Sequence, residues 1–92
     1  MIYFSIDIHF NTIDSDDVIH KPQIIVYDTS FRGAVNQIRY IVSKNARSQI
    51  YFADVWYMGK TDVTYSEVLS HKSYKAKDFI AMINKALGEE LL

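Results

Sequence analysis

The chain has 92 residues, of which 49% are apolar and 23% are charged, and its formal net charge is −1. This composition is typical of one small folded domain and excludes a disordered tail. The absence of cysteine excludes disulfides, thiolate metal sites and cysteine nucleophiles. With a net charge near zero, the chain also lacks the excess of basic residues that most nucleic-acid-binding domains carry.

Signals for a membrane or for export are missing from the sequence. No apolar run approaches the roughly 20 residues that a membrane-spanning helix needs. The first residues also lack a basic start followed by an apolar signal segment. We therefore expect a cytoplasmic protein without a membrane partner. We also expect a homodimer, because a chain of this length has a small core and gains buried surface by association.

Within residues 1–10, apolar side chains recur at every second position from Ile2 onward, which is the pattern of a strand with one buried face. The apolar set would face a core and consists of Ile2, Phe4, Ile6, Ile8 and Phe10. The polar set would face water or a partner and consists of Tyr3, Ser5, Asp7 and His9. This decapeptide therefore predicts an inner strand of a sheet with one open side.

A loop, an edge strand and a helix are expected next. Residues 11–22 are rich in Asn, Asp and Ser and predict a loop. Residues 23–27 predict a short strand, and Pro22 at its entrance favours an edge position. From Phe31 to Val42 apolar residues recur every three or four positions, which predicts a helix capped by the side chains of residues 28–30. This helix should end near Asn45.

Residues 50–58 predict a third strand, which is apolar on both faces and therefore central. The sequence does not decide which side of this strand is buried, because Asp54 shares a side with four large apolar residues. A buried carboxylate without a partner is strongly unfavourable. Either the strand has a bulge near Ala53 and Asp54, or the carboxylate has a partner.

The last part of the chain predicts a hairpin and a second helix. Gly59, Lys60 and Asp62 indicate a turn into a fourth strand at residues 61–69. Ser73 is expected to cap a helix over residues 74–87, and Gly88 is expected to end it.

These elements predict an α+β fold of order ββαββα in one domain, residues 1–92. Handedness and apolarity together favour a four-stranded antiparallel sheet in the order 2-1-3-4, with two helices packed on one face. Residues 1–46 and 49–88 read as two ββα units, which is compatible with an internal duplication.

The open sheet face is the main candidate for binding. Tyr3, Asp7 and His9 point toward it from the first strand, and Tyr51 and Tyr57 join it if the third strand has the matching phase. Tyrosine-rich amphipathic surfaces suit protein contacts, whereas carboxylates would repel a phosphate chain. We therefore expect a non-enzymatic protein-interaction module, such as a small regulator, inhibitor or assembly factor, that uses this face or an edge strand.

Nucleic-acid binding is the alternative function. Arg32, Arg39, Lys44 and Arg47 lie on or just after the first predicted helix, in a stretch without Asp or Glu. A basic helix face of this kind can rest on phosphates. A solvated outer face is the favoured interpretation of the same charges, because they are few.

A small metal-dependent hydrolase is a further alternative. It would use His9 and the acidic loop that contains Asp14, Asp16 and Asp17. The loop lacks the glycine and the glutamate that an EF-hand starting at Asp14 requires. The three glycines of the chain do not form a phosphate-binding loop either. We therefore expect no catalytic residues, no metal site and no cofactor.

Overall fold

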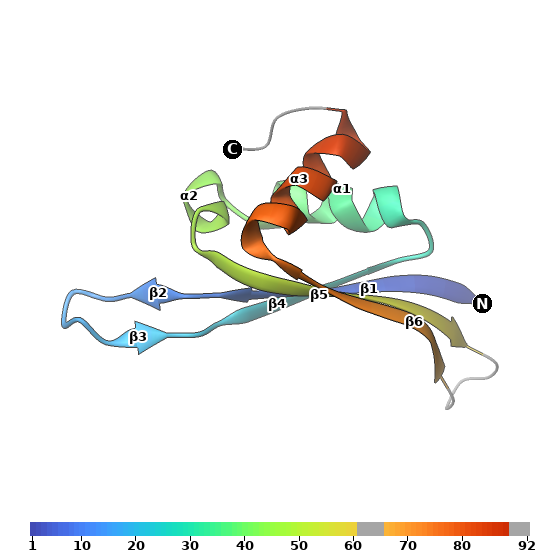
Figure 1. Cartoon of the computed structure of the whole chain (residues 1–92), viewed down its shortest axis with the longest axis horizontal. Helices are drawn as coiled ribbons and strands as arrows, with labels where there is room; N and C mark the ends of the chain where they lie inside the picture. The colour runs from blue at the N-terminus through green and yellow to red at the C-terminus, as the bar shows by residue number, and fades with distance from the viewer. Residues whose placement is uncertain (61–65, 89–92) are drawn as a thin grey trace.

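The chain forms an antiparallel sheet with helices on one of its faces (Figure 1). This arrangement is seen in a computed structural model that describes residues 1–60 and 66–88. Within these ranges the elements are β1 (Ile2–Phe10), β2 (Thr12–Ile13), β3 (Ile19–His20), β4 (Gln23–Asp28), α1 (Phe31–Ile41), α2 (Lys44–Arg47), β5 (Ile50–Lys60), β6 (Ser66–Lys75) and α3 (Ala76–Leu87). The predicted α+β class is confirmed. Among these helices none has the length and apolarity that crossing a membrane would require.

The main sheet has the strand order β4-β1-β5-β6, and each neighbouring pair is antiparallel. Counted without the short β2 and β3, this is the predicted order 2-1-3-4. β1 and β5 are the inner strands, and β4, which follows Pro22, lies at an edge. β2 and β3 form a separate two-stranded ribbon that extends beyond the end of the main sheet (Figure 1).

The core lies between the sheet and the helices α1 and α3, which cover the same face (Figure 1). Its buried side chains are Ile6, Ile8, Phe10, Val26, Ala34, Val35, Ile38, Val42, Ile50, Ala53, Phe79 and Ile83. Full burial of each large aliphatic or aromatic side chain contributes about 1.5–3 kcal/mol. The helix-covered face is therefore the main source of stability, and the opposite face is left for other contacts.

The start of α1 is held by two side chains. Ser30 is the N-cap, and its hydroxyl accepts a hydrogen bond from the Gly33 N–H at 3.0 Å. The Asp28 carboxylate accepts a hydrogen bond from the Ser30 N–H, also at 3.0 Å. A Cβ atom at position 33 would lie 2.5 Å from the Asp28 carboxyl group. Gly33 therefore leaves the space in which this carboxylate lies against the helix.

The first helix is shorter than predicted. α1 ends at Ile41, Val42 takes an extended conformation, and the Ser43 hydroxyl caps α2 by accepting from the Ala46 N–H at 3.1 Å. Asn45 therefore lies inside α2 instead of ending α1. The change of direction keeps Val42 in the core, and a serine N-cap stabilises a new helix start.

The fourth strand reaches further toward the C-terminus than predicted. Ser73 belongs to β6, where it pairs with Asp54 of β5, and it does not cap a helix. α3 instead begins at Ala76, with Lys75 as an N-cap that makes no side-chain hydrogen bond. Pairing with a neighbouring strand overrides the local capping preference of serine. Gly88 ends α3 in the left-handed conformation, as predicted.

The predicted turn between the third and fourth strands falls at the limit of the described chain. Gly59 and Lys60 are the last residues of β5, and Asp62 lies outside the described residues.

The segment of residues 11–22 contains the β2–β3 ribbon where a loop was expected. Asp14 organises its turn, since the carboxylate accepts hydrogen bonds from the N–H groups of Asp16 at 2.9 Å and Val18 at 3.0 Å. Asp17 has a φ of 60°, in the left-handed region that short polar side chains tolerate.

We predict that Gly33→Ala lowers the stability of the protein by about 1–3 kcal/mol, the usual range for overpacking. In an unobstructed helix the same change would be stabilising by about 1 kcal/mol. The new Cβ would displace the Asp28 carboxylate from the Ser30 N–H. Urea unfolding measures the difference. In an Asp28→Ala background the alanine should no longer destabilise, and a Gly33→Ala single variant that is more stable than the parent would contradict this account.

The same carboxylate predicts a pH dependence of stability. The hydrogen bond from the Ser30 N–H holds the pKa of Asp28 below its ordinary value, although burial opposes this shift. A lowered pKa in the folded state stabilises the protein above the unfolded-state pKa, and this stabilisation is lost as the pH falls through the folded-state pKa. Asp28→Asn should therefore be less stable than the parent at pH 7, with the gap closing below about pH 4. Urea unfolding across this range would contradict the prediction if the gap were constant.

Candidate functional site

The sheet face away from the helices carries the candidate site, and we call it the open face. Its members follow from the strand register and from the alternation of side chains along each strand. They include Gln23, Ile25 and Tyr27 of β4, Tyr3, Ser5, Asp7 and His9 of β1, Phe52, Asp54, Trp56 and Met58 of β5, and Val68, His71 and Ser73 of β6.

The register between β1 and β5 decides the facing of β5, which the sequence left open. Asp54 lies directly opposite Asp7, and Tyr57 lies opposite Phe4. The Tyr57 ring is 4.9 Å from the Phe4 ring, and the Phe4 ring also contacts the Phe31 ring of α1. Tyr57 therefore lies on the helix-covered side, and its predicted place on the open face is wrong. On β5, Asp54 therefore lies on the open face, and Tyr57 lies on the helix-covered face.

A bulge near the start of β5 made this phase hard to read. The register shifts between His9 and Phe10, which pair with Phe52 and Ile50 respectively. Tyr51 is the extra residue on β5, so the buried Ile50 and the open-face Phe52 do not share a side. Tyr51 is exposed and lies edge-on to Phe52, with 5.4 Å between the ring centroids.

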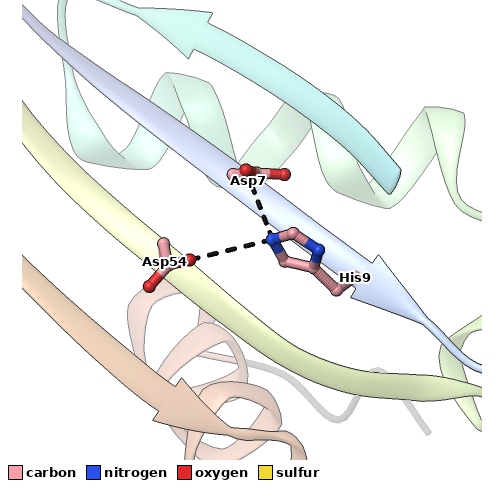
Figure 2. A group of neighbouring side chains, drawn as sticks. All are labelled: Asp7, His9 and Asp54. Atoms are coloured by element: carbon pink, nitrogen blue, oxygen red, sulfur yellow. Dashed lines mark ion pairs between the residues drawn. The ribbon is translucent and has the colours of Figure 1, made fainter. Parts of the chain in front are cut away.

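Two carboxylates and two imidazoles gather at the middle of the open face, and we call Asp7, His9, Asp54 and His71 the carboxylate–histidine cluster. His9 Nε2 lies 3.3 Å from Asp7 Oδ2 and 3.7 Å from Asp54 Oδ2 (Figure 2). His71 Nε2 lies 2.9 Å from Asp54 Oδ1, on the other side of that carboxylate. The structure thus brings the predicted Asp7 and His9 together with Asp54. The partners of the Asp54 carboxylate are His9 and His71.

Polar neighbours hold both carboxylates in place. The Gln23 amide donates to Asp7 Oδ1 and Oδ2 at 3.1 and 3.2 Å, and the Ser73 hydroxyl donates to Asp54 Oδ1. Burial raises the pKa of Asp54, but the Ser73 and His71 hydrogen bonds and the nearby imidazoles outweigh burial and leave this pKa below its ordinary value. Asp54 is therefore held as an acceptor, with its charged form favoured.

Each imidazole of the cluster lies flat on an aromatic ring of β5. The rings of His9 and Phe52 are 4.1 Å apart at an angle of 8°, and those of His71 and Trp56 are 3.8 Å apart at 21°. Stacking restricts the rotation of both imidazoles. Their Nε2 atoms are consequently directed at the carboxylates between them.

Next to the cluster lies an apolar surface, which we call the aromatic end. It consists of Tyr3, Tyr27, Trp56, Met58 and Val68, which together with Ser5 line a shallow hollow. The Tyr3 and Tyr27 rings are 6.2 Å apart at 55°. Both tyrosines also border a neighbouring hollow at the end of the sheet, beside Met1 and Lys60. The predicted Tyr3 thus belongs to an aromatic surface that joins four strands of the open face.

The predicted basic strip has structural contacts on the helix side. Arg32 donates through Nη1 to the Ala86 carbonyl at 2.7 Å, which joins α1 to α3. Arg47 donates through Nη2 to the Arg39 carbonyl at 2.8 Å, which joins α2 to α1. Lys44 is the first residue of α2. Arg32 and Arg39 belong to α1, and Lys44 and Arg47 belong to α2, so none of the four is a residue of the strands that form the open face.

The grouping that a metal-dependent hydrolase would use is divided in two. His9 lies at Asp7 and Asp54, whereas Asp14 pairs with His20 at 2.7 Å in the ribbon. Hydrogen bonds to the Asp14 carboxylate lower its pKa. The bond with His20 has the largest effect, and the bonds from two backbone N–H groups add to it. In the described part of the chain, the side chains that gather as candidate metal ligands are Asp7, His9 and Asp54.

Sequence reasoning missed Tyr27, Trp56, Met58 and Val68 of the aromatic end, and it also missed His71 and Ser73 beside Asp54. His71 and Ser73 follow the predicted fourth strand, and Ser73 is the predicted helix cap, but both lie on β6. Their spacing of two residues was the available signal, because it matches Asp7 and His9 and places both on one face of a strand. This spacing indicates a site only if β6 pairs with β5 as far as Asp54, and the sequence does not show that pairing.

The open face therefore combines two chemical properties. The carboxylate–histidine cluster offers acceptor oxygens and imidazole nitrogens, and the aromatic end offers surface that gains from being covered. Comparison with protein-family models, with curated proteins and with solved structures finds no match to this chain.

Proposed function

We propose that this chain is a non-enzymatic protein-interaction module, in the class of small regulators, inhibitors or assembly factors, whose contact surface is the aromatic end. The observation that carries the proposal is the uncovered hollow lined by Tyr3, Tyr27, Trp56, Met58 and Val68. All helices described in the structure lie on the other face of the sheet (Figure 1). Aromatic residues and methionine are enriched at protein interfaces, where they supply much of the binding energy.

The composition of this hollow favours a protein over a nucleic acid. Its lining residues include no lysine or arginine, so phosphates would find no cation there. Asp7 and Asp54 lie further along the same face and would repel a phosphate chain.

The occupant that we propose is a second copy of the chain. Exposed apolar surface continues from the hollow to Met1 at the same end of the sheet, which extends the surface available to a symmetric contact. Asp7 lies four residues beyond Tyr3 on β1, or about 13 Å along the strand. Two copies can therefore meet at their aromatic ends without bringing their carboxylates together.

We predict that the protein is a dimer at micromolar concentrations and that Tyr27→Thr raises the dimer dissociation constant at least tenfold. A loss of about 1.4 kcal/mol of binding energy, which is below the usual threshold for an interface hot spot, is sufficient for this change. Threonine keeps the β-propensity of the strand, so the fold is retained. Sedimentation velocity over a range of protein concentrations measures the effect.

Tyr51→Thr is the matched control. Tyr27 and Tyr51 are 57% and 56% exposed, but Tyr51 lies at the bulge of β5, away from the aromatic end. The control should leave the dimer unchanged. A protein that is strictly monomeric at tens of micromolar, or a dimer that both variants weaken equally, would exclude the aromatic end as the dimer interface.

A further inference from the structure

We propose that Asp7, His9 and Asp54 form a binding site for one divalent transition-metal ion, with Zn²⁺ as the best match. Asp7 and His9 are two residues apart on β1 and so project from the same face, and Asp54 lies opposite Asp7 on β5. One oxygen of each carboxylate and one imidazole nitrogen lie within 4.8 Å of one another. Figure 2 shows the two carboxylates on either side of the imidazole nitrogen.

The separations between His9 Nε2 and the two carboxylate oxygens suit a tetrahedral ion. Zn²⁺ binds nitrogen and oxygen ligands at about 2.0–2.2 Å, so two ligands at a tetrahedral angle are about 3.3–3.6 Å apart. His9 Nε2 lies 3.3 Å from Asp7 Oδ2 and 3.7 Å from Asp54 Oδ2. The second separation is too long for a hydrogen bond and close to that of two ligands sharing a metal. His9 therefore needs little movement to share an ion with either carboxylate.

The surroundings of each ligand resemble the outer contacts of a metal site. Metal ligands are commonly oriented by a further hydrogen bond or packing contact. The Gln23 amide orients Asp7, His71 and Ser73 hold the far oxygen of Asp54, and Phe52 stacks on His9. The contacts to Asp54 lie on the side away from the proposed ion, whereas the Gln23 amide donates to both Asp7 oxygens, including the proposed ligand atom Oδ2.

Charge supports a divalent cation in particular. Carboxylates directly opposite each other on neighbouring strands repel, and Asp7 and Asp54 are such a pair. In residues 1–60 and 66–88 their ion-pair partners are histidines. A divalent ion bound by both carboxylates and a neutral His9 would balance their charge. The side chains of Asp7, Asp54 and His9 are 19%, 17% and 25% exposed, which leaves the fourth tetrahedral position open to water or another ligand.

The test is a titration of the untagged protein with Zn²⁺, and separately with Co²⁺, after treatment with a chelator and dialysis. Isothermal calorimetry should give one Zn²⁺ per chain, and the visible spectrum of Co²⁺ should change with the same stoichiometry. His9→Gln and Asp54→Asn should each weaken Zn²⁺ binding at least tenfold. Gln23→Ala, which removes an outer contact, should weaken it by about tenfold. Circular dichroism checks that each variant is folded, and Asp7→Asn replaces any variant that is not.

The ribbon provides a matched control, because Asp14 and His20 are a second carboxylate–imidazole pair with a 2.7 Å contact. The double variant Asp14→Asn, His20→Gln should bind Zn²⁺ as the parent does. The proposal is overturned if the parent binds neither ion at hundreds of micromolar, or if the ribbon variant loses binding while His9→Gln keeps it. The dimer interface and the metal site are tested by different variants, so failure of one leaves the other standing.

Discussion

The pairing of β1 with β5 is the constraint on which the rest of the structure depends. β1 is hydrogen-bonded along both edges, to β4 and to β5, so its two faces are separated completely by the sheet. Ile6 and Ile8 enter the core on one side, while Asp7 and His9 are directed to the other. A shift of register by one residue would exchange these sets, because side chains alternate along a strand. The same register therefore determines both the core and the open face.

The open face can carry charge because the hydrophobic core lies on the other face of the sheet. Burial under α1 and α3 stabilises the fold without help from the other side of the sheet. Asp7 and Asp54 are opposed carboxylates, an arrangement that does not improve the stability of a sheet by itself. Gln23, His71 and Ser73 provide the hydrogen bonds that make it tolerable. Polar clusters of this kind in an otherwise consistent fold are typical of functional surfaces.

The open face has two neighbouring parts with different chemistry, which Trp56 connects. Its ring stacks on His71 of the carboxylate–histidine cluster, and the same residue lines the hollow of the aromatic end. A change at one part can therefore alter the other through the position of this ring. The helix side offers less scope for binding through Arg32 and Arg47, because their guanidinium groups donate to backbone carbonyls that join the helices.

The sequence by itself determined the elements whose signals are local. The alternation in residues 1–10 and the periodicity after Phe31 predicted the helix-covered face and the open position of Asp7 and His9, because each pattern has the period of its element. The predicted sheet order rested on the handedness of the connections and on the apolarity of the strands. Only the tertiary structure decided which side chains meet across strands. The bulge at Tyr51 set the phase of β5, and the extension of β6 brought His71 to Asp54. Such contacts depend on register between distant segments, which no local pattern encodes.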